Sequence, residues 1–561
     1  MQMLRLSLIV VCISLVSCGD DDGPAADGGA DGSQPRDASG VDPDDDGGTA
    51  GKPEMCTDAK GVRCVCEKGS AGASGKCAAR VSCDDKPCGN APNMCAEASD
   101  GYSCTCGTGF MGTGSTSCTD IDECKTNNGG CAMSVFCENT VGGSKCGTCP
   151  QGLIGDGKVC TSAWTKLVGT NLEDKAQAIA ADAAGNVYIA GYTAGGFSGA
   201  TNAGEFDVFV AKLNADGTVW VQQIGGSGAD IAYGVSVDGA GNVYVAGTTS
   251  GAIDGNTGAG SQDLFLIKYD GSGAKQWSRQ YGTAGVDYAF NIVTNAAGDT
   301  YIAATLADDI DGTNNAGDSD AAVIKYDAAG ARQWTRQFGT AEADIAYGIA
   351  LDATGNVYVT GTTKGNLVGP NAGDTDDFVR KYDGMGMAEW TRQLGSSATD
   401  YARAAATDAS GNVFVVGSSG GSFDGNSSAG SFDLVLVKYD ATGTKSWSRQ
   451  LGSDNYDYGQ GVTTDATGAV YIAGYTTGNF DGHTSLGLAD FVVVKFDGAG
   501  AKQWSRQLGG AQDDFGFDLK VASAGSLFIA GASDGDLDKS PKANPGFDAF
   551  VTKYDAAGNH L

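Results

Sequence analysis

The sequence predicts an all-β fold: seven small sheets arranged as a seven-bladed β-propeller, preceded by small disulfide-rich modules and a disordered acidic linker. The main observation is a repeat. All the tryptophans of the chain recur at intervals of 56 or 57 residues, at Trp164, Trp220, Trp277, Trp334, Trp390, Trp447 and Trp504. Each unit is too small to bury its own apolar face, and a regular period of this size is typical of a repeat architecture.

Each repeat contains four short runs that read as strands. In the unit that begins at Trp447, apolar residues alternate with polar or small ones over residues 447–451, 459–465, 469–475 and 490–496, and Gly, Asp, Asn and Ser separate the runs. A period of two indicates β-strands, and no helical period competes with it. Four strands per unit make one propeller blade, and radial repetition closes seven such sheets without long exposed edges.

From Trp164 to Leu561 the units read much like "DxAxGVAVDxxGNVYVAGxT…DxFVxKYDxxGxxxW" and resemble the SBBP (seven-bladed β-propeller) repeat family. The resemblance implies that the GVxVD run is the inner strand, NVYVAG the second, FVxKYD the third and WxRQxG the outer one. Because the chain enters on an outer-type strand at 164–169, we expect that strand to complete the last blade. Each tryptophan is expected to dock between adjacent blades, as in the similar motif of quinoprotein-type propellers, without implying a quinone cofactor.

The N-terminal part has the features of an exported lipoprotein. Residues 1–17 are predicted to be a signal peptide, because the apolar stretch Leu6–Val16 is too short to span a membrane. The sequence LVSC at Leu15–Cys18 resembles a bacterial lipobox, which implies lipidation of Cys18; an ordinary signal peptide cut nearby is the alternative. Residues 18–52 are mostly Asp, Gly, Ala, Ser and Pro and predict a disordered spacer. We therefore expect lipid anchoring at the bacterial outer membrane or cell surface.

Sixteen cysteines lie between Cys56 and Cys160, and the predicted propeller has none. That density in an exported chain predicts disulfides rather than a zinc site. Residues 79–119 and 120–161 resemble EGF-like modules, while Cys56, Cys64, Cys66 and Cys77 resemble part of a third, over residues 53–78, whose pairing the sequence leaves open. The resemblance implies the pairs Cys83–Cys95, Cys88–Cys104, Cys106–Cys118, Cys124–Cys137, Cys131–Cys146 and Cys149–Cys160.

The second complete module carries the most specific chemistry. DIDEC at 120–124 and CENT at 137–140 resemble the consensus of calcium-binding EGF-like modules. Ca²⁺ prefers six to eight oxygen ligands. The resemblance implies side-chain ligands from Asp120, Glu123 and Asn139 and carbonyl ligands from Ile121, Thr140 and Gly143. We also expect Phe110 of the preceding module to pack against residues 141–142.

The charge of the chain limits its partners. With 36 basic and 68 acidic residues the net charge is -32, which argues against nucleic acid and against direct contact with anionic lipid head groups. The expected ligand is therefore a protein or a carbohydrate, and the chain is expected to attach to the membrane through its lipid anchor only.

Two long loops of each blade emerge on one face, which we call the long-loop face. One loop leads from the outer strand to the inner strand of the next blade, and the other joins the second and third strands. Aspartates recur there and predict an acidic rim; the alternative is that they cap turns. The positions are Asp230, Asp287, Asp344, Asp400, Asp457 and Asp514 in the first loop and Asp254, Asp311, Asp424, Asp481 and Asp538 in the second.

Nothing in the sequence identifies an enzyme. No GxSxG, HExxH or phosphate-loop motif is present, and no residue is assigned a catalytic role. The recurrent arginines are expected on outer strands, away from the axis: Arg279, Arg336, Arg392, Arg449 and Arg506. The leading hypothesis is binding or adhesion through the long-loop face. The alternatives are an extracellular hydrolase or lyase with its site at the axial mouth and a structural envelope component.

Overall fold

The computed structural model describes the chain in parts. The described residues are 54–57, 63–66, 93–98, 101–106, 108–111, 118–133, 135–147, 153–155, 158, 160–162, 164–310, 312–313, 315–522, 525–535, 537 and 546–561. Only the backbone is described for 54–57, 63–66, 93–98, 101–104, 153–155 and 160–162. The predicted signal peptide, Cys18 and the acidic linker lie outside the described residues.

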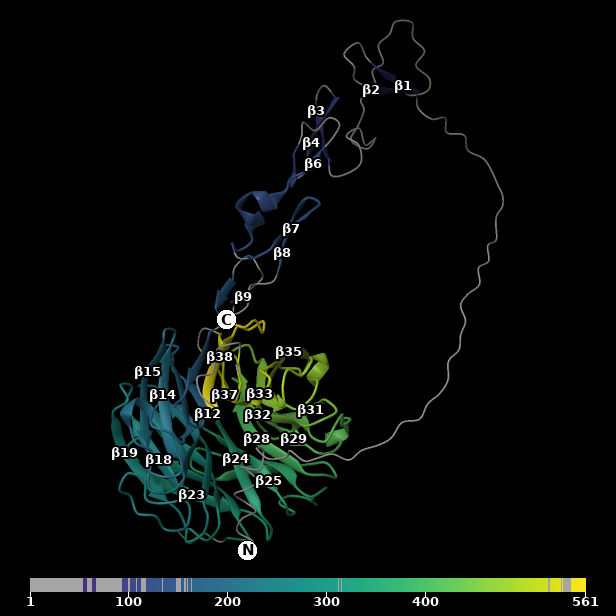
Figure 1. The fold of residues 1–561 in the computed structure, drawn as a ribbon. Coiled ribbons are helices and arrows are strands. Elements are labelled where there is room, and N and C mark those ends of the chain that lie inside the picture. Colours follow the sequence, from purple (N-terminus) through teal and green to yellow (C-terminus); the bar gives the residue numbers. More distant parts are fainter. Residues whose placement is uncertain are drawn as a thin grey trace, which may run out of the picture. The chain divides into compact units, whose positions relative to one another are not determined.

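Residues 164–561 form seven four-stranded antiparallel sheets, which we number blades 1 to 7 (Figure 1). Blades 1 to 3 consist of β12 (Asp174–Ala181), β13 (Val187–Thr193), β14 (Asp207–Asn214), β15 (Gly217–Ile224); β16 (Asp230–Val237), β17 (Val243–Thr249), β18 (Asp263–Tyr269), β19 (Lys275–Tyr281); β20 (Tyr288–Thr294), β21 (Thr300–Leu306), β22 (Asp320–Tyr326), β23 (Arg332–Phe338). Blades 4 to 6 consist of β24 (Asp344–Leu351), β25 (Val357–Thr363), β26 (Asp376–Tyr382), β27 (Ala388–Leu394); β28 (Asp400–Thr407), β29 (Val413–Ser419), β30 (Asp433–Tyr439), β31 (Lys445–Leu451); β32 (Asp457–Thr464), β33 (Val470–Thr476), β34 (Asp490–Phe496), β35 (Lys502–Leu508). Blade 7 consists of β36 (Asp514–Val521), β37 (Leu527–Ser533), β38 (Asp548–Tyr554) and β11 (Thr165–Val168).

The seven-bladed all-β fold and its strand order are confirmed. Sheet order follows chain order within a blade, and the first strands of neighbouring blades contact one another around the axis. The second strands β17, β25, β29 and β33 are buried at every position, because blades cover both of their faces. The predicted alternation of buried and exposed residues is therefore seen most clearly on the inner and outer strands.

The first strand closes the ring. Strand β11 pairs antiparallel with β38, with Leu167 opposite Phe550 and Val168 opposite Ala549. Val168 is buried in the core between blades 7 and 1. The outer strand of blade 7 thus comes from the start of the repeat region, as predicted.

Each tryptophan docks on the next blade, which confirms that prediction. A Cβ on Gly273, a residue with φ of 88°, would lie 2.9 Å from the ring of Trp220, so this turn accepts only glycine beneath the indole. The neighbouring arginine strengthens the contact: the guanidinium of Arg279 lies 5.0 Å from the ring centroid of Trp277, and its Nε donates to the carbonyl of Gly330 at 2.9 Å. The recurrent arginines are therefore blade-to-blade clamps.

One buried residue departs from the repeat. Asp377 lies on β26 where the blade 2 and blade 5 sheets have Leu264 and Leu434. It is 6% exposed, and its Oδ1 has no hydrogen-bond partner among the described residues. Burial raises the pKa of Asp377 well above its usual value, and the carboxylates of Asp400 and Asp376 add to the shift.

We expect Asp377→Leu to stabilise the propeller, because it replaces a buried carboxyl, one oxygen of which has no hydrogen-bond partner among the described residues, with a side chain that other blades already accommodate. The free energy of unfolding should rise by about 1–3 kcal/mol. Urea denaturation followed by tryptophan fluorescence measures this. A lower stability would show that Asp377 makes a favourable interaction.

The chain before the propeller consists of short hairpins. The strands pair as β1 (Glu54–Thr57) with β2 (Arg63–Cys66), β3 (Asn93–Ala98) with β4 (Gly101–Cys106), β5 (Phe110–Met111) with β6 (Thr119–Asp120), β7 (Cys137–Thr140) with β8 (Gly143–Cys146), and β9 (Leu153–Gly155) with β10 (Cys160–Ser162). The helices are short 3-10 turns: η3 (Glu123–Lys125), η4 (Asn127–Gly130), η5 (Phe197–Gly199), η6 (Phe423–Gly425) and η7 (Phe480–Gly482). None of the helices in the described parts of the chain has the length and apolarity to cross a bilayer.

Three disulfides are described: Cys106–Cys118, Cys124–Cys137 and Cys131–Cys146. They are three of the six pairs that the resemblance to EGF-like modules implies. The other predicted pairs, and the open pairing of Cys56, Cys64, Cys66 and Cys77, involve side chains outside the described residues.

Candidate functional site

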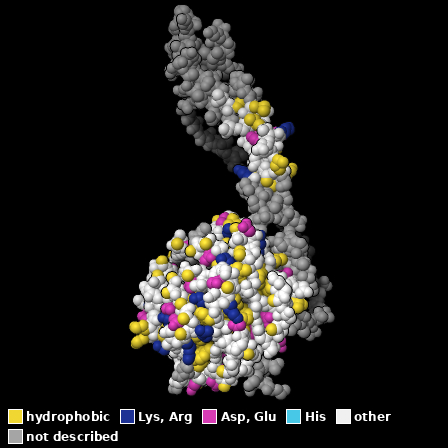
Figure 2. All heavy atoms as spheres, turned by 90° about the vertical axis from the view of Figure 1, so that its left-hand side faces the viewer, with side chains coloured by type: hydrophobic (Ala, Val, Ile, Leu, Met, Phe, Trp, Pro, Cys, Tyr) yellow, Lys and Arg dark blue, Asp and Glu magenta, His cyan; other side chains and the backbone are white. Residues whose placement is uncertain are grey.

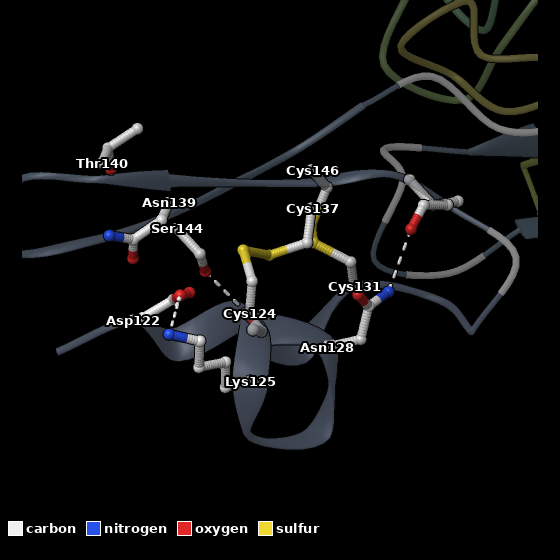
Figure 3. The surroundings of a disulfide bond; sticks show 12 residues. Asp122, Cys124, Lys125, Asn128, Cys131, Cys137, Asn139, Thr140, Ser144 and Cys146 are labelled. Atoms are coloured by element: carbon white, nitrogen blue, oxygen red, sulfur yellow. Dashed lines mark hydrogen bonds and ion pairs between the residues drawn. A yellow bond between two sulfur atoms is a disulfide. The ribbon is translucent and has the colours of Figure 1, made fainter.

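Two of the predicted calcium ligands, Asn139 and Thr140, lie on β7 beside the disulfides of the module of residues 120–161 (Figure 3). Disulfides Cys124–Cys137 and Cys131–Cys146 fasten the η3–η4 segment to the β7–β8 hairpin. This brings Asn139 to Asp120: the Asn139 amide donates to Asp120 Oδ2 at 2.7 Å, and the backbone N–H of Gly142 donates to Oδ1 at 2.6 Å. Asp120 and Asn139, which are distant in the sequence, therefore lie next to each other.

The remaining predicted ligands differ from one another in their hydrogen bonding. Glu123 has a buried Oε2 without a hydrogen-bond partner among the described residues. The Gly143 carbonyl accepts a hydrogen bond from the Thr140 hydroxyl at 2.9 Å, and Ile121 donates its N–H to Gly109. In the described residues no three His, Cys, Asp or Glu side chains converge in a metal-like group, so amide and carbonyl oxygens would have to complete the shell.

The contact expected between the modules is present. A Cβ on Gly142 would lie 2.8 Å from the Phe110 ring, which shows that the ring packs directly against this glycine. The β5–β6 pairing and the bond from Ile121 N to Gly109 O, at 2.8 Å, hold the same junction.

The predicted acidic rim on the long-loop face is wrong for the outer-to-inner loops. Asp230, Asp287, Asp344, Asp400, Asp457 and Asp514 are all 0% exposed. Each accepts the backbone N–H of the residue four positions before it, for example from Ser396 to Asp400 at 2.6 Å. The alternative, turn capping, is therefore correct, and the side chains are buried because they point between blades.

The second-to-third loops carry paired aspartates. Asp254, Asp424 and Asp481 form ion pairs with Lys275, Lys445 and Lys502 and accept hydrogen bonds from neighbouring serines. Asp311 and Asp538 lie outside the described residues. On the face that Figure 2 shows, acidic and basic side chains are interspersed over the propeller.

A ring of side chains surrounds the axis near the long-loop face. Every inner strand has a β-bulge that adds one residue three positions after the strand's aspartate. The bulge residues in blades 1 to 7 are Gln177, Tyr233, Phe290, Tyr347, Arg403, Gln460 and Phe517. Across blades 2 to 5 they contact in order: Tyr233 to Phe290 at 5.6 Å, Phe290 to Tyr347 at 4.9 Å, and Arg403 over Tyr347 at 4.5 Å, measured to ring centroids.

Sequence reasoning missed Arg403. It sought arginines that recur, and Arg403 occurs at this position in blade 5 only. Aligning the units on their inner-strand aspartates would have placed the seven bulge residues in one column and shown that this column varies while the position before it is always Ala or Gly.

Below the bulge ring, the second halves of the inner strands enclose an axial cavity of about 390 Å³. Asp518 is one of its lining residues. Its Oδ2 accepts the N–H of Ile179 in blade 1 at 3.0 Å and its Oδ1 accepts that of Leu519 at 2.8 Å. Burial raises the pKa of Asp518 to about 6. Both oxygens thus accept backbone N–H groups, and the bond to Oδ2 joins blade 7 to blade 1.

We expect acidification from about pH 7.5 to about pH 5 to stabilise the propeller. Burial raises the folded-state pKa of Asp514 and Asp518 to about 6, above the value of about 3.9 expected in the unfolded chain. The folded state therefore binds protons first, and stability rises as pH falls through about 6, by roughly 1.4 kcal/mol per group at pH 5. Turn aspartates with lowered pKa, such as Asp182 and Asp352, lose their contribution only below about pH 4.

Urea midpoints at the two pH values test this expectation. Asp518→Asn should reduce the gain, because it removes one of the titrating groups. The fold should tolerate the change, since asparagine already occupies the equivalent position in blade 3 as Asn291. A midpoint that falls on acidification would contradict the assignment of these groups as destabilising when charged.

The fold and its sequence define the class: a seven-bladed β-propeller protein that carries SBBP repeats. Five segments match the family described as "Beta-propeller repeat" (SBBP): 163–198, 219–253, 333–367, 389–424 and 446–481.

Among curated proteins, the chain is similar to three relatives over short segments. They are the regulatory protein FlaEY of Caulobacter vibrioides (29% identity over 137 residues; 23% of this chain, 14% of that protein), cubilin of Homo sapiens (46% over 61 residues; 10% and 2%) and thrombospondin-4 of Bos taurus (48% over 50 residues; 9% and 5%). The chain thus spans 14% or less of the length of these relatives. A solved structure of YCF48 bound to D1 peptide aligns with 70% of this chain and 97% of its own, at 9% identity and a TM-score of 0.36.

Proposed function

We propose that this chain is an exported, lipid-anchored surface protein whose propeller is a binding head. The observation that carries the proposal is the bulge ring. Fold-forming positions repeat around the propeller, whereas the seven bulge residues near the long-loop end of the axis differ in chemistry from blade to blade. Variation confined to one end of the axis is what a specific ligand site requires.

The anchor is proposed to be a lipid on Cys18, followed by the acidic spacer. Palmitate labelling tests it: label should enter the wild-type protein and not Cys18→Ser, which should appear in the soluble fraction. Membrane retention of unlabelled Cys18→Ser would contradict the proposed anchor.

We further propose that the module of residues 120–161 binds Ca²⁺. The unpartnered Glu123 Oε2, together with the meeting of Asp120 and Asn139, supports this assignment. Both Asp120 oxygens accept hydrogen bonds, so Ca²⁺ would replace the Asn139 amide donor by turning the amide oxygen inward. The proposed role of the ion is to stiffen the joint between the modules.

Calorimetric titration of the full chain with Ca²⁺ should give a dissociation constant on the order of 10⁻⁴–10⁻³ M, as in extracellular modules. Asp120→Ala should weaken binding by at least about tenfold, because it removes a charged ligand. Asp122→Ala is the matched control: Asp122 lies two residues away but pairs with exposed Lys125 at 3.1 Å, so its loss should leave binding nearly unchanged (Figure 3).

Equal effects of the two substitutions would contradict the ligand assignment. Ca²⁺ binding that persists in both variants would show that the metal binds to another part of the chain.

The second candidate, an extracellular hydrolase or lyase at the axial mouth, rests on Asp518 and its raised pKa. Because both of its oxygens already accept backbone N–H groups, we propose a structural role for Asp518 and favour the binding function.

A further inference from the structure

The sevenfold repeat provides an internal comparison for every position on the long-loop face. At each junction, the residue before the third strand of one blade adjoins the residue before the inner strand of the next. In chain order from blade 1 the pairs are Phe206–Ala229, Gln262–Val286, Ser319–Ala343, Thr375–Thr399, Phe432–Tyr456, Ala489–Asp513 and Phe547–Glu173. Only the junction of blades 5 and 6 has aromatic residues on both sides, so the fold itself does not require them.

At this junction four aromatic rings lie nearly parallel. Phe432 stacks with Tyr456, Tyr458 and Tyr401 at centroid distances of 6.3, 5.5 and 6.0 Å, with interplanar angles of 20°, 23° and 23°. The rings of Tyr456 and Tyr458 are 5° from parallel. Tyr456 is 46% exposed, and the other three are partly exposed. We call these four residues the aromatic platform.

Arg403, the blade 5 member of the bulge ring, contacts this platform. Its guanidinium is 5.4 Å from the ring centroid of Tyr401 and 4.5 Å from that of Tyr347. Burial raises the pKa of Tyr458 to about 12, and the positive charge of Arg403 opposes that rise, as it does at Tyr401 and Tyr475. Arg403 therefore faces tyrosines from blades 4, 5 and 6.

The guanidinium of Arg403 has no polar partner in the described residues, where it makes neither a hydrogen bond nor an ion pair. This distinguishes it from the clamp arginines and from Lys175. The clamp arginines donate to carbonyls, as Arg392 does to Gly443 at 2.7 Å, and Lys175, at the start of blade 1, pairs with Glu173 at 3.1 Å. In a chain of net charge -32, a partly exposed guanidinium without a polar partner is available to bind an external anion.

We propose that the aromatic platform and Arg403 bind a carboxylated pyranose, such as a uronic acid residue of an acidic polysaccharide. The inference rests on the proposed binding function of the propeller and names its ligand class. Aromatic faces pack against the C–H face of a sugar ring, tyrosine hydroxyls match its hydroxyl rim, and a guanidinium receives a planar carboxylate in two parallel hydrogen bonds. An acidic peptide would satisfy Arg403 but leave the exposed Tyr456 ring at the edge of the stacked aromatic residues without a matching partner.

The test is calorimetric titration of the full chain with oligogalacturonate and with the matched neutral oligogalactose. The wild-type protein should bind the uronate at least about tenfold more tightly, the discrimination that one charged hydrogen-bonded pair provides. Arg403→Gln should remove this preference, because the carboxylate loses its partner. The fold should tolerate the change, since Gln177 and Gln460 occupy the same bulge in blades 1 and 6.

Two further variants separate the parts of the site. Tyr456→Ala should weaken the binding of both saccharides by a similar factor, because it removes part of the platform and leaves the Arg403 charge in place. Val219→Ala, at an exposed position on the outer strand of blade 1 and outside the bulge ring, is the control and should change neither. Thermal unfolding of each variant shows whether the propeller remains intact.

Uronate binding that is unchanged in Arg403→Gln, or equal affinity for the neutral saccharide, would overturn the proposal. Binding of polyglutamate in place of either saccharide, lost in Arg403→Gln, would overturn the carbohydrate assignment and leave the propeller as a binding head. If neither probe binds and the full chain also fails to adhere to bacterial surfaces, the proposed binding function fails with it.

Discussion

Deleting residues 164–169 from the full chain is expected to lower the free energy of unfolding of the propeller by at least about 5 kcal/mol. The deletion removes β11, the outer strand of blade 7, and with it buried Val168 and the Trp164 ring, which lies 5.4 Å from Phe528. It also removes the hydrogen bond from Trp164 Nε1 to the Ala215 carbonyl in blade 1, at 2.9 Å. Blade 7 then ends in an unpaired β38, an edge that favours association between chains.

Urea denaturation and light scattering measure these two effects. A six-residue deletion at 41–46, in the predicted spacer, is the control and should alter neither. If the free energy of unfolding of the deletion variant lies within about 1 kcal/mol of the wild-type value, that result would contradict the role of this strand.

The second large effect is expected at the glycine that ends each outer strand. A Cβ on Gly395 would lie 2.6 Å from Cγ of Asp376, closer still to its Oδ1, and 3.0 Å from Oδ2 of Asp400. Both carboxyl groups are buried between blades 4 and 5, so neither can move aside freely. Gly395→Ala should therefore destabilise the propeller by about 3 kcal/mol through overpacking.

Gly369→Ala is the matched control within the same blade. Nothing lies within 4 Å of a Cβ at Gly369, and its backbone is not in the left-handed region, so the urea midpoint should not fall. A similar loss in both variants would indicate a general intolerance of alanine rather than contact with the buried aspartates.

The repeat made the architecture predictable. Seven tryptophans at a fixed spacing determined the number of blades, and alternation within one unit placed its strands close to their observed bounds, with β34 over 490–496 as predicted. Closure by the first strand followed from which strand type begins the region. These features are properties of every repeat, so errors at single positions do not affect them.

The electrostatics of the long-loop face was not predictable in the same way. Whether Asp400 is exposed depends on how blade 5 packs against blade 4, and the sequence of one unit contains no information on that packing. Arg403 was missed for a different reason, because a repeat consensus omits a residue that occurs at its position in one blade only. Its position also depends on a β-bulge, which changes the direction of the side chain relative to simple alternation.

The central claim is that this propeller binds its ligand at the long-loop end of the axis, at the junction of blades 5 and 6. Hydrogen–deuterium exchange of the full chain, with and without saturating oligogalacturonate, tests it most directly. We predict slower exchange at residues 399–404 and 455–459, with little change in the equivalent segments of blades 2 and 3. Protection confined to the turns at the opposite face, or to the module of residues 120–161, would contradict the claim.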